Sequence, residues 1–318
     1  MKNKVSATAE APARQRTIGG NWKTQLGYYA MLLLPAAWIF LTNYIPMLGI
    51  YLGFIDYKPA KGFLGSDWVG LKHLISFFSG PDLPRVLRNT LFYNIATIIL
   101  ISLGCGVFFA LLLYEIRRKV PLKIYHTCML LPSFISWTVF SAALQIVLNT
   151  ESGLLNQLLA VFGMHPVSWY RTKEYWPTII MVCMVIKHAG MSSIYFYSAL
   201  LSIDTELFAA ARLDGANRFK QIIHISLPSM SKVLGITMIT QMGSILSSSL
   251  APYYQLTLNN GELYDTTLTL GIYMYNGLSS GRYSYTTAVG LAQSLIGLAL
   301  VVLSNTIVRR IDPDSSLF

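Results

Sequence analysis

Charged residues are scarce in this sequence. Asp, Glu, Lys and Arg make up 12% of its 318 residues, whereas hydrophobic residues make up 53%, and the mean hydropathy is +0.49. An ordinary soluble domain carries about 25% charged residues. Several apolar stretches are also long enough to cross a bilayer core of about 30 Å. The composition excludes an ordinary soluble domain and predicts an all-α polytopic membrane protein.

Motifs for catalysis and for nucleotide binding are absent as well. The sequence has no G-x-x-x-x-G-K-[ST] phosphate loop, no H-E-x-x-H, no paired cysteine motif and no G-x-S-x-G. Its three cysteines, Cys105, Cys128 and Cys183, all fall in apolar segments, where cysteine behaves as a small hydrophobe. We therefore expect no catalytic residue, metal site, disulfide or cofactor in this chain, and any ATP must be bound by another protein.

Six apolar stretches predict transmembrane helices. They are 27–54, 89–114, 124–148, 176–201, 231–250 and 287–308. A membrane domain over 27–308 would then lie between two tails, 1–26 and 309–318. The first tail has basic and small residues but no apolar core followed by a cleavage site, so we expect it to be retained.

The basic residues predict the orientation, because Lys and Arg of short flanks stay on the cytoplasmic side. They gather in the first tail, in the loop after the second stretch and at the chain end, whereas 149–175 and 251–286 are nearly balanced. Both termini are therefore expected in the cytoplasm. The formal charge of +10 is divided among separate loops, which argues against nucleic-acid binding.

One polar run, 204–228, falls between the fourth and fifth stretches and is predicted to be cytoplasmic. Its residues 205–213 favour a helix that Asp204 or Thr205 caps, and Gly215 provides a bend. A second short helix is expected from Asn217 to Ile225, ended by Pro228. Two explanations fit the pattern: an element that docks a partner, or a plain amphipathic connector.

The same run resembles the EAA loop of type I ABC importer permeases. The match rests on "AAARLDGA" followed by "ISLP", with nine residues between Gly215 and Ile225. In that family the loop is the coupling helix that inserts into the ATPase subunit. The usual glutamate falls on Ala209, so we hypothesise that Glu206 replaces it. The coupling residues that the resemblance implies are Glu206, Ala209, Ala210, Ala211, Asp214, Gly215, Ile225, Leu227 and Pro228.

Other segments extend the resemblance to most of the chain. They include "LRNTLFYN" and "YSYTTAVGLAQSLIGLALVVLSN", which are similar to permeases of the maltose-permease kind that import oligosaccharides, among them alginate or similar polyuronates. The resemblance implies a place in the bacterial inner membrane. It also implies several partners: a second permease, two ATPase subunits that bind ATP and Mg, and an extracytoplasmic solute-binding protein.

Polar side chains within the apolar stretches are candidates for a substrate pathway. In the fifth stretch they recur every three or four residues, at Thr237, Thr240, Gln241, Ser244, Ser247 and Ser248. We select Gln241 and Ser244 from this stripe and Trp137 from the third stretch. The alternative is that small and hydroxylated residues only pack helices closely, and that Trp137 lies in the core or at the interface.

Lys187 and His188 lie near the middle of the fourth stretch, where an unpaired charge is costly. A cation there would suit an acidic sugar. Lys187 could instead lie at a cavity edge, bond a carbonyl or pair with a carboxylate of a second permease.

Tyrosines are frequent in 251–286, where most are expected to be interfacial anchors. Tyr273 and Tyr275 are the candidates for stacking on a sugar ring. The resemblance implies that 251–286 and 56–88 receive the solute-binding protein.

Two other functions remain open. An ion-coupled secondary transporter would need inverted repeats and acidic residues in the membrane, and neither is found. A membrane scaffold or sensor would bind partners without moving a substrate.

Overall fold

The computed structural model describes residues 22–247 and 249–311. It divides into two compact units, 1–51 and 52–318, and each is described by itself. Most of the predicted tail 1–26, the end of the tail 309–318 and Ser248 lie outside the described residues.

The first unit holds a helical run. The run begins with α1 (Trp22–Ile39) and continues through the π-helical turn η1 (Phe40–Tyr44) and α2 (Ile45–Met47), and the 3-10 helix η2 (Leu48–Phe54) follows it along the chain. Residues Gln25–Phe54 are apolar and long enough to span a membrane, and the most apolar part of this run is not buried by the protein. The first predicted stretch, 27–54, is therefore confirmed as a candidate membrane helix.

The second unit contains three further helices of membrane-spanning length. The first, Leu83–Glu115, runs through α4 (Leu83–Ala96), the π-helical η3 (Thr97–Cys105) and α5 (Gly106–Glu115). The others are α9 (Trp176–Leu201) and α17 (Tyr283–Ile311). The described residues thus give four candidate spans, or six if each of two bent helix pairs counts as one span.

The third predicted stretch, 124–148, is not one straight helix. It contains most of α6 (Lys119–Phe134) and all of α7 (Trp137–Val147), and these two helices meet at 92°. Ile135 and Ser136 have extended backbone there, and the Ser136 hydroxyl caps α7 by accepting a 3.3 Å hydrogen bond from the Val139 N–H. Periodicity missed the break because both helices are apolar and only two residues separate them.

The fifth stretch, 231–250, is shorter than predicted, because α13 (Ser231–Gly243) ends at Gly243. The prediction that Pro228 ends the helix before it is also wrong. Helical structure runs from α11 (Arg218–Gln221) through the π-helical η5 (Ile222–Ser226) into α12 (Leu227–Ser229), and a 54° bend separates it from α13. Pro228 is tolerated because it directly follows the π-helical turn η5, where the Leu227 N–H already bonds the Ile222 carbonyl and the regular α-helical hydrogen-bond pattern is interrupted.

The remaining elements are short. The described residues are mostly helical, as predicted, and they add one small antiparallel pair of strands in which Ile55 pairs with Trp68 and Asp56 with Asp67. The elements are β1 (Ile55–Asp56), β2 (Asp67–Trp68), α3 (Lys72–Phe78), α8 (Leu154–Val161), η4 (Lys173–Tyr175), α10 (Thr205–Leu213), α14 (Leu250–Thr257), η6 (Gly261–Leu263), α15 (Tyr264–Thr267) and α16 (Leu270–Ser279).

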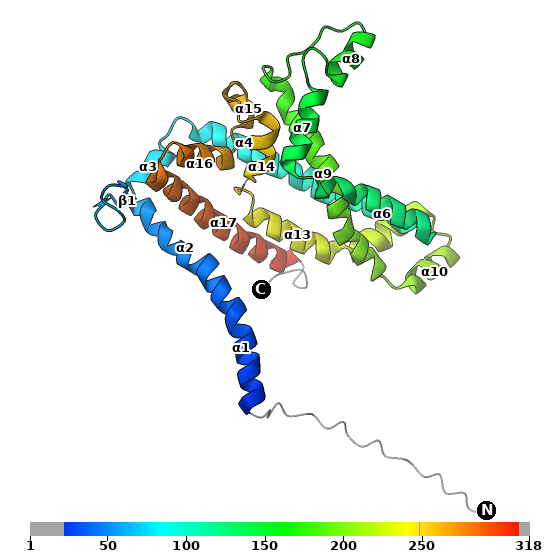
Figure 1. The fold of residues 1–318 in the computed structure, drawn as a ribbon. Helices are drawn as coiled ribbons and strands as arrows, with labels where there is room; N and C mark the ends of the chain where they lie inside the picture. The colour runs from blue at the N-terminus through cyan, green and yellow to red at the C-terminus, as the bar shows by residue number, and fades with distance from the viewer. Residues whose placement is uncertain (1–21, 248, 312–318) are drawn as a thin grey trace, which may run out of the picture. The chain divides into compact units, whose positions relative to one another are not determined.

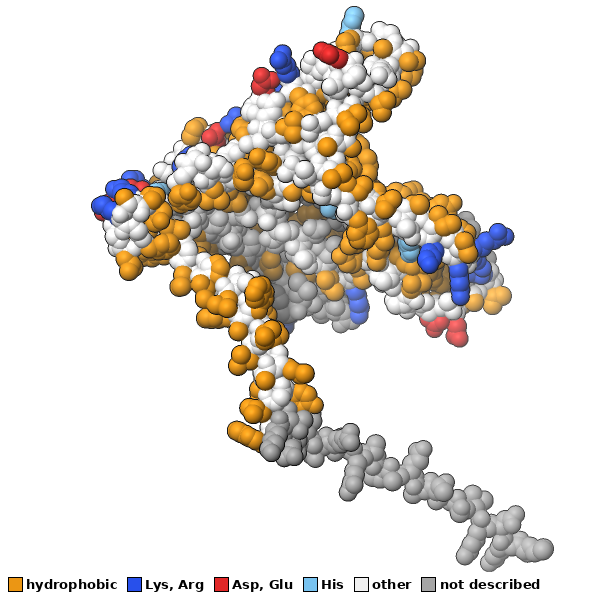
Figure 2. Space-filling model, viewed as in Figure 1, with side chains coloured by type: hydrophobic (Ala, Val, Ile, Leu, Met, Phe, Trp, Pro, Cys, Tyr) orange, Lys and Arg blue, Asp and Glu red, His pale blue; other side chains and the backbone are white. Residues whose placement is uncertain are grey.

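Two hydrophobic clusters lie toward opposite ends of α9. One contains Trp176 and Ile180, and the other contains Phe196, Leu200 and Phe208. Between them α9 packs closely on α6 (Figure 1), since a Cβ at Gly190 would collide with the Met129 carbonyl. Hydrophobic side chains cover much of the visible surface of the helices, and charged side chains gather toward the ends (Figure 2). This distribution is that of a bundle that spans a bilayer.

Candidate functional sites of the helix bundle

The run 204–228 forms a helix, a bend and a second helix, as predicted. The Asp204 carboxylate caps α10 by accepting a 2.9 Å hydrogen bond from the Glu206 N–H. Gly215 has φ +74° and no heavy atom near its missing Cβ. The Asn217 side chain then caps α11 through the Lys220 N–H at 2.9 Å. Because these hydrogen bonds join near neighbours, the local sequence by itself favours the bend.

The outer surface of this run is apolar and exposed. Leu213 is 90% exposed, Phe219 is 69% exposed, and Ala209 and Ala210 are exposed as well. An exposed apolar patch on a short polar loop is typical of a surface that another protein covers. Glu206, the hypothesised replacement for the missing glutamate, is also exposed.

The inner surface of the run is anchored to the bundle. The Phe208 ring is 6% exposed and lies 5.9 Å from the Tyr114 ring at the end of α5. Arg218 forms a 3.4 Å ion pair with Glu115 of the same helix end. A movement of the exposed patch would therefore be transmitted to α5 and α9 through these packed side chains.

Of the other predicted coupling residues, Ala211, Ile225 and Leu227 are half-buried, and Asp214 and Pro228 are exposed. The structure therefore gathers the predicted set on one element. Whether these residues contact an ATPase stays a prediction.

Lys187, His188 and Trp137 meet at the break between α6 and α7. Lys187 is 3% exposed, and its ammonium group donates hydrogen bonds to the carbonyl oxygens of Ile135 and Pro132, the latter at 3.2 Å. The same nitrogen lies 4.8 Å from the centre of the Trp137 ring, and the His188 ring lies 5.9 Å from that ring. Because helix α6 ends here, its last carbonyl groups lack N–H donors from a following helical turn, and the Lys187 ammonium group serves as the donor.

This geometry matches one of the explanations that the sequence left open for Lys187, a bond to a carbonyl. Contact of Lys187 with a sugar stays a prediction.

Gln241 and Ser244 line a small polar cavity of about 140 Å³. The Gln241 amide donates a 2.8 Å hydrogen bond to the Ser102 hydroxyl of η3. Ser244 follows the last residue of α13, so the predicted polar stripe of the fifth stretch is helical only up to Gln241. The other residues of the cavity wall are Asn94, Thr97, Ile98, Met184, Ser247, Ser249 and Tyr253.

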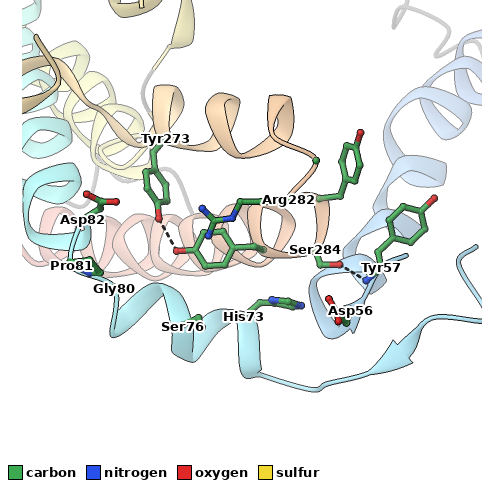
Figure 3. A pocket seen from close by; sticks show the side chains of 13 residues that line it. Asp56, Tyr57, His73, Ser76, Gly80, Pro81, Asp82, Tyr273, Arg282 and Ser284 are labelled. Atoms are coloured by element: carbon green, nitrogen blue, oxygen red, sulfur yellow. Dashed lines mark hydrogen bonds between the residues drawn. The ribbon is translucent and has the colours of Figure 1, made fainter. Parts of the chain in front are cut away.

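Tyr273 lines a larger cavity of about 550 Å³, which Figure 3 shows from close by. Its hydroxyl lies 2.8 Å from that of Tyr285. Arg282 stands over the Tyr285 ring, with its guanidinium carbon 4.2 Å from the ring centre. Tyr275 is not part of this wall and pairs with Tyr254 at 4.9 Å between ring centres.

The large cavity and the exposed loop lie at opposite ends of one helix. Asp82, in the cavity wall, directly precedes the run Leu83–Glu115, and Glu115 at its other end pairs with Arg218. A helix of 33 residues is about 50 Å long. The two sites therefore lie at opposite ends of a candidate membrane span.

Sequence reasoning missed several residues of this cavity, above all Arg282 and His73. A usable signal was present, since Arg282 is the one basic residue of 251–286 and stands between Gly281 and two tyrosines, Tyr283 and Tyr285. Position 73 carried no such signal, because nothing in the local sequence predicts that α3 packs beside α17.

Polar long-range contacts hold this side of the bundle together. Lys173 donates a 2.6 Å hydrogen bond to the Asp265 carboxylate, and Arg88 donates one of 2.6 Å to the Asp265 carbonyl. The hydrogen bond from Lys173 lowers the pKa of the Asp265 carboxyl, and its positive charge acts in the same direction.

The comparisons with known proteins agree with this arrangement. The family described as the inner membrane component of binding-protein-dependent transport systems matches residues 102–316. The chain belongs to this family: it is a multi-pass inner-membrane permease subunit of an ABC importer. Membership overturns the ion-coupled secondary-transporter alternative.

Two relatives from Bacillus subtilis strain 168 match almost the whole chain. The polygalacturonan/rhamnogalacturonan transport system permease protein YteP is 33% identical, over 96% of this chain and 97% of its own length. Protein LplB is 32% identical, over 98% of each chain.

Solved structures match as well. A bacterial ABC transporter involved in the import of the acidic polysaccharide alginate has a TM-score of 0.82 at 27% identity, covering 91% of this chain and 97% of that one. A bacterial alginate ABC transporter in complex with an alginate pentasaccharide-bound periplasmic protein has a TM-score of 0.81 at 27% identity, covering 91% and 96%.

Proposed function

We propose that this permease imports acidic oligosaccharides of the polyuronate kind from a solute-binding protein into the cytoplasm. The import is driven by two ATPase subunits that bind ATP and Mg, and a second permease completes the membrane pathway. Both termini and the loop 204–228 face the cytoplasm. The observation that carries this proposal is the exposed apolar patch at the Gly215 bend, with Leu213 90% and Phe219 69% exposed.

The patch supports a coupling role because it combines a docking surface with a rigid connection. ATP-driven closure of the ATPases moves α10, and Phe208 and Arg218 transmit that movement to α5 and α9. The bundle then changes from an inward-open to an outward-open state, and hydrolysis resets it. Glu206 is the residue of α10 that we expect to replace the glutamate missing at Ala209.

An acidic oligosaccharide is supported by the similar proteins and by the side chains available. Of the similar proteins named above, YteP is a polygalacturonan/rhamnogalacturonan transport system permease, and the two solved transporters are alginate transporters. Hydroxyl and amide groups at Gln241 and Ser244 line a polar cavity within the bundle, where sugar hydroxyls can exchange water for protein partners. Trp137, Lys187 and His188 form the adjoining part of the pathway in this proposal.

The test is ATP hydrolysis in vesicles that contain the second permease and the ATPases, with the solute-binding protein added. We expect stimulation by oligogalacturonate or oligoalginate that requires the binding protein, and radiolabelled sugar should accumulate inside the vesicles. Stimulation by neutral oligosaccharides alone would overturn the acidic substrate. Assembly with the ATPases without sugar uptake would favour the scaffold or sensor alternative.

A further inference from the structure

The cavity around Arg282 and Tyr273 has no role in the coupling between ATPases and helix bundle that is proposed above. It lies between the segment 56–82 and the region where α16 meets α17, and the wall residues come from both (Figure 3). Its volume of about 550 Å³ falls in the range of roughly 300–1,000 Å³ that is typical of small-molecule sites.

The cavity combines one available cation with aromatic rings. Among the described residues no carboxylate forms an ion pair with Arg282, and Asp82 pairs with Arg85 at 2.5 Å. The Arg282 guanidinium instead lies on the Tyr285 ring at 4.2 Å. A guanidinium in this position presents its N–H groups as a fork that matches a carboxylate.

The backbone around Arg282 is fixed. Its N–H donates a 2.9 Å hydrogen bond to the Gly277 carbonyl at the end of α16, and the Ser284 hydroxyl accepts one of 2.9 Å from the Tyr57 N–H. His73 is held by a 3.1 Å contact between its Nε2 and the Ile55 carbonyl. A site whose walls are already positioned loses less entropy when a ligand binds.

Carboxylates at the two ends of the cavity suit a ligand that carries hydroxyl groups as well as a charge. In Figure 3 Arg282 stands between Asp82 at one end and Asp56 at the other. These carboxylates accept hydrogen bonds from hydroxyl groups, which a sugar supplies. The Tyr273 and Tyr285 hydroxyls add further partners, and tyrosine faces suit pyranose rings.

We propose that this cavity is an entry site for a uronate residue on the side of the membrane opposite the coupling loop, with Arg282 binding the sugar carboxylate. The proposal rests on the proposed function and gives it a location: the acidic sugar is selected at the entrance, before it reaches Gln241 and Ser244.

The experiment measures equilibrium binding of trigalacturonate to the assembled importer in lipid nanodiscs, without the solute-binding protein. The methyl ester of the same trisaccharide serves as a neutral probe. Arg282→Gln should weaken trigalacturonate binding about tenfold or more and leave ester binding unchanged. Arg282→Lys, which keeps the charge but loses the fork, should cause a smaller loss.

Arg171→Gln is the matched control, because Arg171 is an exposed arginine in the loop before α9, on the same side of the membrane and outside the cavity wall. It should bind trigalacturonate like the wild type. If Arg282→Gln and Arg171→Gln bind equally well, or if the wild type binds no trigalacturonate, the entry site is wrong.

Sugar-stimulated ATP hydrolysis of the same preparation separates the two proposals. Normal stimulation of ATP hydrolysis together with unchanged trigalacturonate binding in Arg282→Gln would overturn the proposed entry site but not the proposed importer function. No stimulation by any sugar would overturn the importer itself. If Arg282→Gln fails to assemble, the comparison of Arg282→Lys with Arg171→Gln gives the same decision.

Discussion

The loop 204–228, which we propose as the coupling loop, and the opposite end of the bundle are held by different kinds of hydrogen bond. In the loop the bonds join near neighbours: Asp204 to Glu206, Asn217 to Lys220, and Gln221 to Ala216. At the opposite end they join residues that are distant in sequence. Examples are Tyr57 with Ser284 and Arg88 with Asp265, which are 227 and 177 residues apart.

This difference fits the roles that we propose for the two ends. A loop whose shape depends only on itself can move as a rigid lever without losing its internal bonds. The opposite end is assembled from three distant parts of the chain, so a change in the packing of the bundle alters its cavity. We therefore expect mutations in the loop to affect coupling, and mutations at the opposite end to affect stability and sugar binding.

The largest expected effect is that of Gly215→Val. A β-branched residue at φ +74° is strained by about 1–3 kcal/mol, so the bend shifts and the patch no longer fits its partner. Sugar-stimulated ATP hydrolysis in vesicles should fall about 5–150-fold.

Gly163→Val is the control for that strain. Gly163 has φ +73° and an equally open surrounding, but it lies in the turn after α8 at the opposite end. It should retain most of the stimulation. Equal losses in both variants would show that strain alone, and not the lever, causes the defect.

Lys187→Met should have the next largest effect, and it tests a residue between the two ends. The change leaves carbonyl groups at the α6 end unbonded, which costs about 2 kcal/mol. The apparent Tm of the detergent-solubilised protein should fall by about 4–8 °C, and Lys123→Met, an exposed change on the same helix, should leave it unchanged.

Transport separates the two roles of Lys187. If the residue only holds the helix break, uptake of acidic and neutral oligosaccharides should fall together. A loss confined to acidic sugars would assign it to the substrate, and unchanged uptake of both would remove it from the pathway.

Gln241→Leu should have a smaller effect, because it removes one bond between α13 and η3. Side-chain hydrogen bonds within membranes contribute about 0.6 kcal/mol on average. A double-mutant cycle with Ser102→Ala should recover a coupling energy of that size in unfolding experiments. Thr240→Val is the control, since among the described residues the Thr240 hydroxyl donates to the Ile236 carbonyl of its own helix, and it should show no coupling to Ser102. A coupling energy of zero between Gln241 and Ser102 would contradict the contact.

The smallest expected effect is a dependence on pH at the end away from the coupling loop. The pKa of the Asp265 carboxyl is lowered by Lys173, so its contribution to stability is complete above the unfolded value of about 3.9 and is lost as the pH falls through the lower folded value. Thermal unfolding between pH 7 and 5 should not depend on this group. Asp265→Asn should remove part of the destabilisation seen below about pH 4; an unchanged acid profile would contradict the assignment.

Much of the fold was predictable, because its signals are local. Length and hydropathy identified α9 and α17, since a helix that crosses a bilayer needs about 20 apolar residues wherever it packs. The coupling loop was predictable for a similar reason: Asp204, Gly215 and Asn217 determine its caps and bend through their own backbone and nearest neighbours.

The breaks in the helices were not predictable from periodicity. Ile135 and Ser136 interrupt an apolar stretch that continues on both sides, and the carbonyl groups freed there are satisfied by Lys187, which is 52 residues away from Ile135. The prediction at Pro228 was wrong in the opposite direction, because the π-helical turn before it interrupts the regular hydrogen-bond pattern and the helix continues past the proline.

The sequence by itself determined the class of this protein, its apolar helices and the shape of its coupling loop, since composition and short-range hydrogen bonds act without the rest of the chain. Tertiary structure alone decided which polar residues share a cavity. Lys187 meets a helix end, Gln241 meets Ser102, and Arg282 faces the segment of His73. These contacts join residues from distant helices, so they exist only once the bundle has packed.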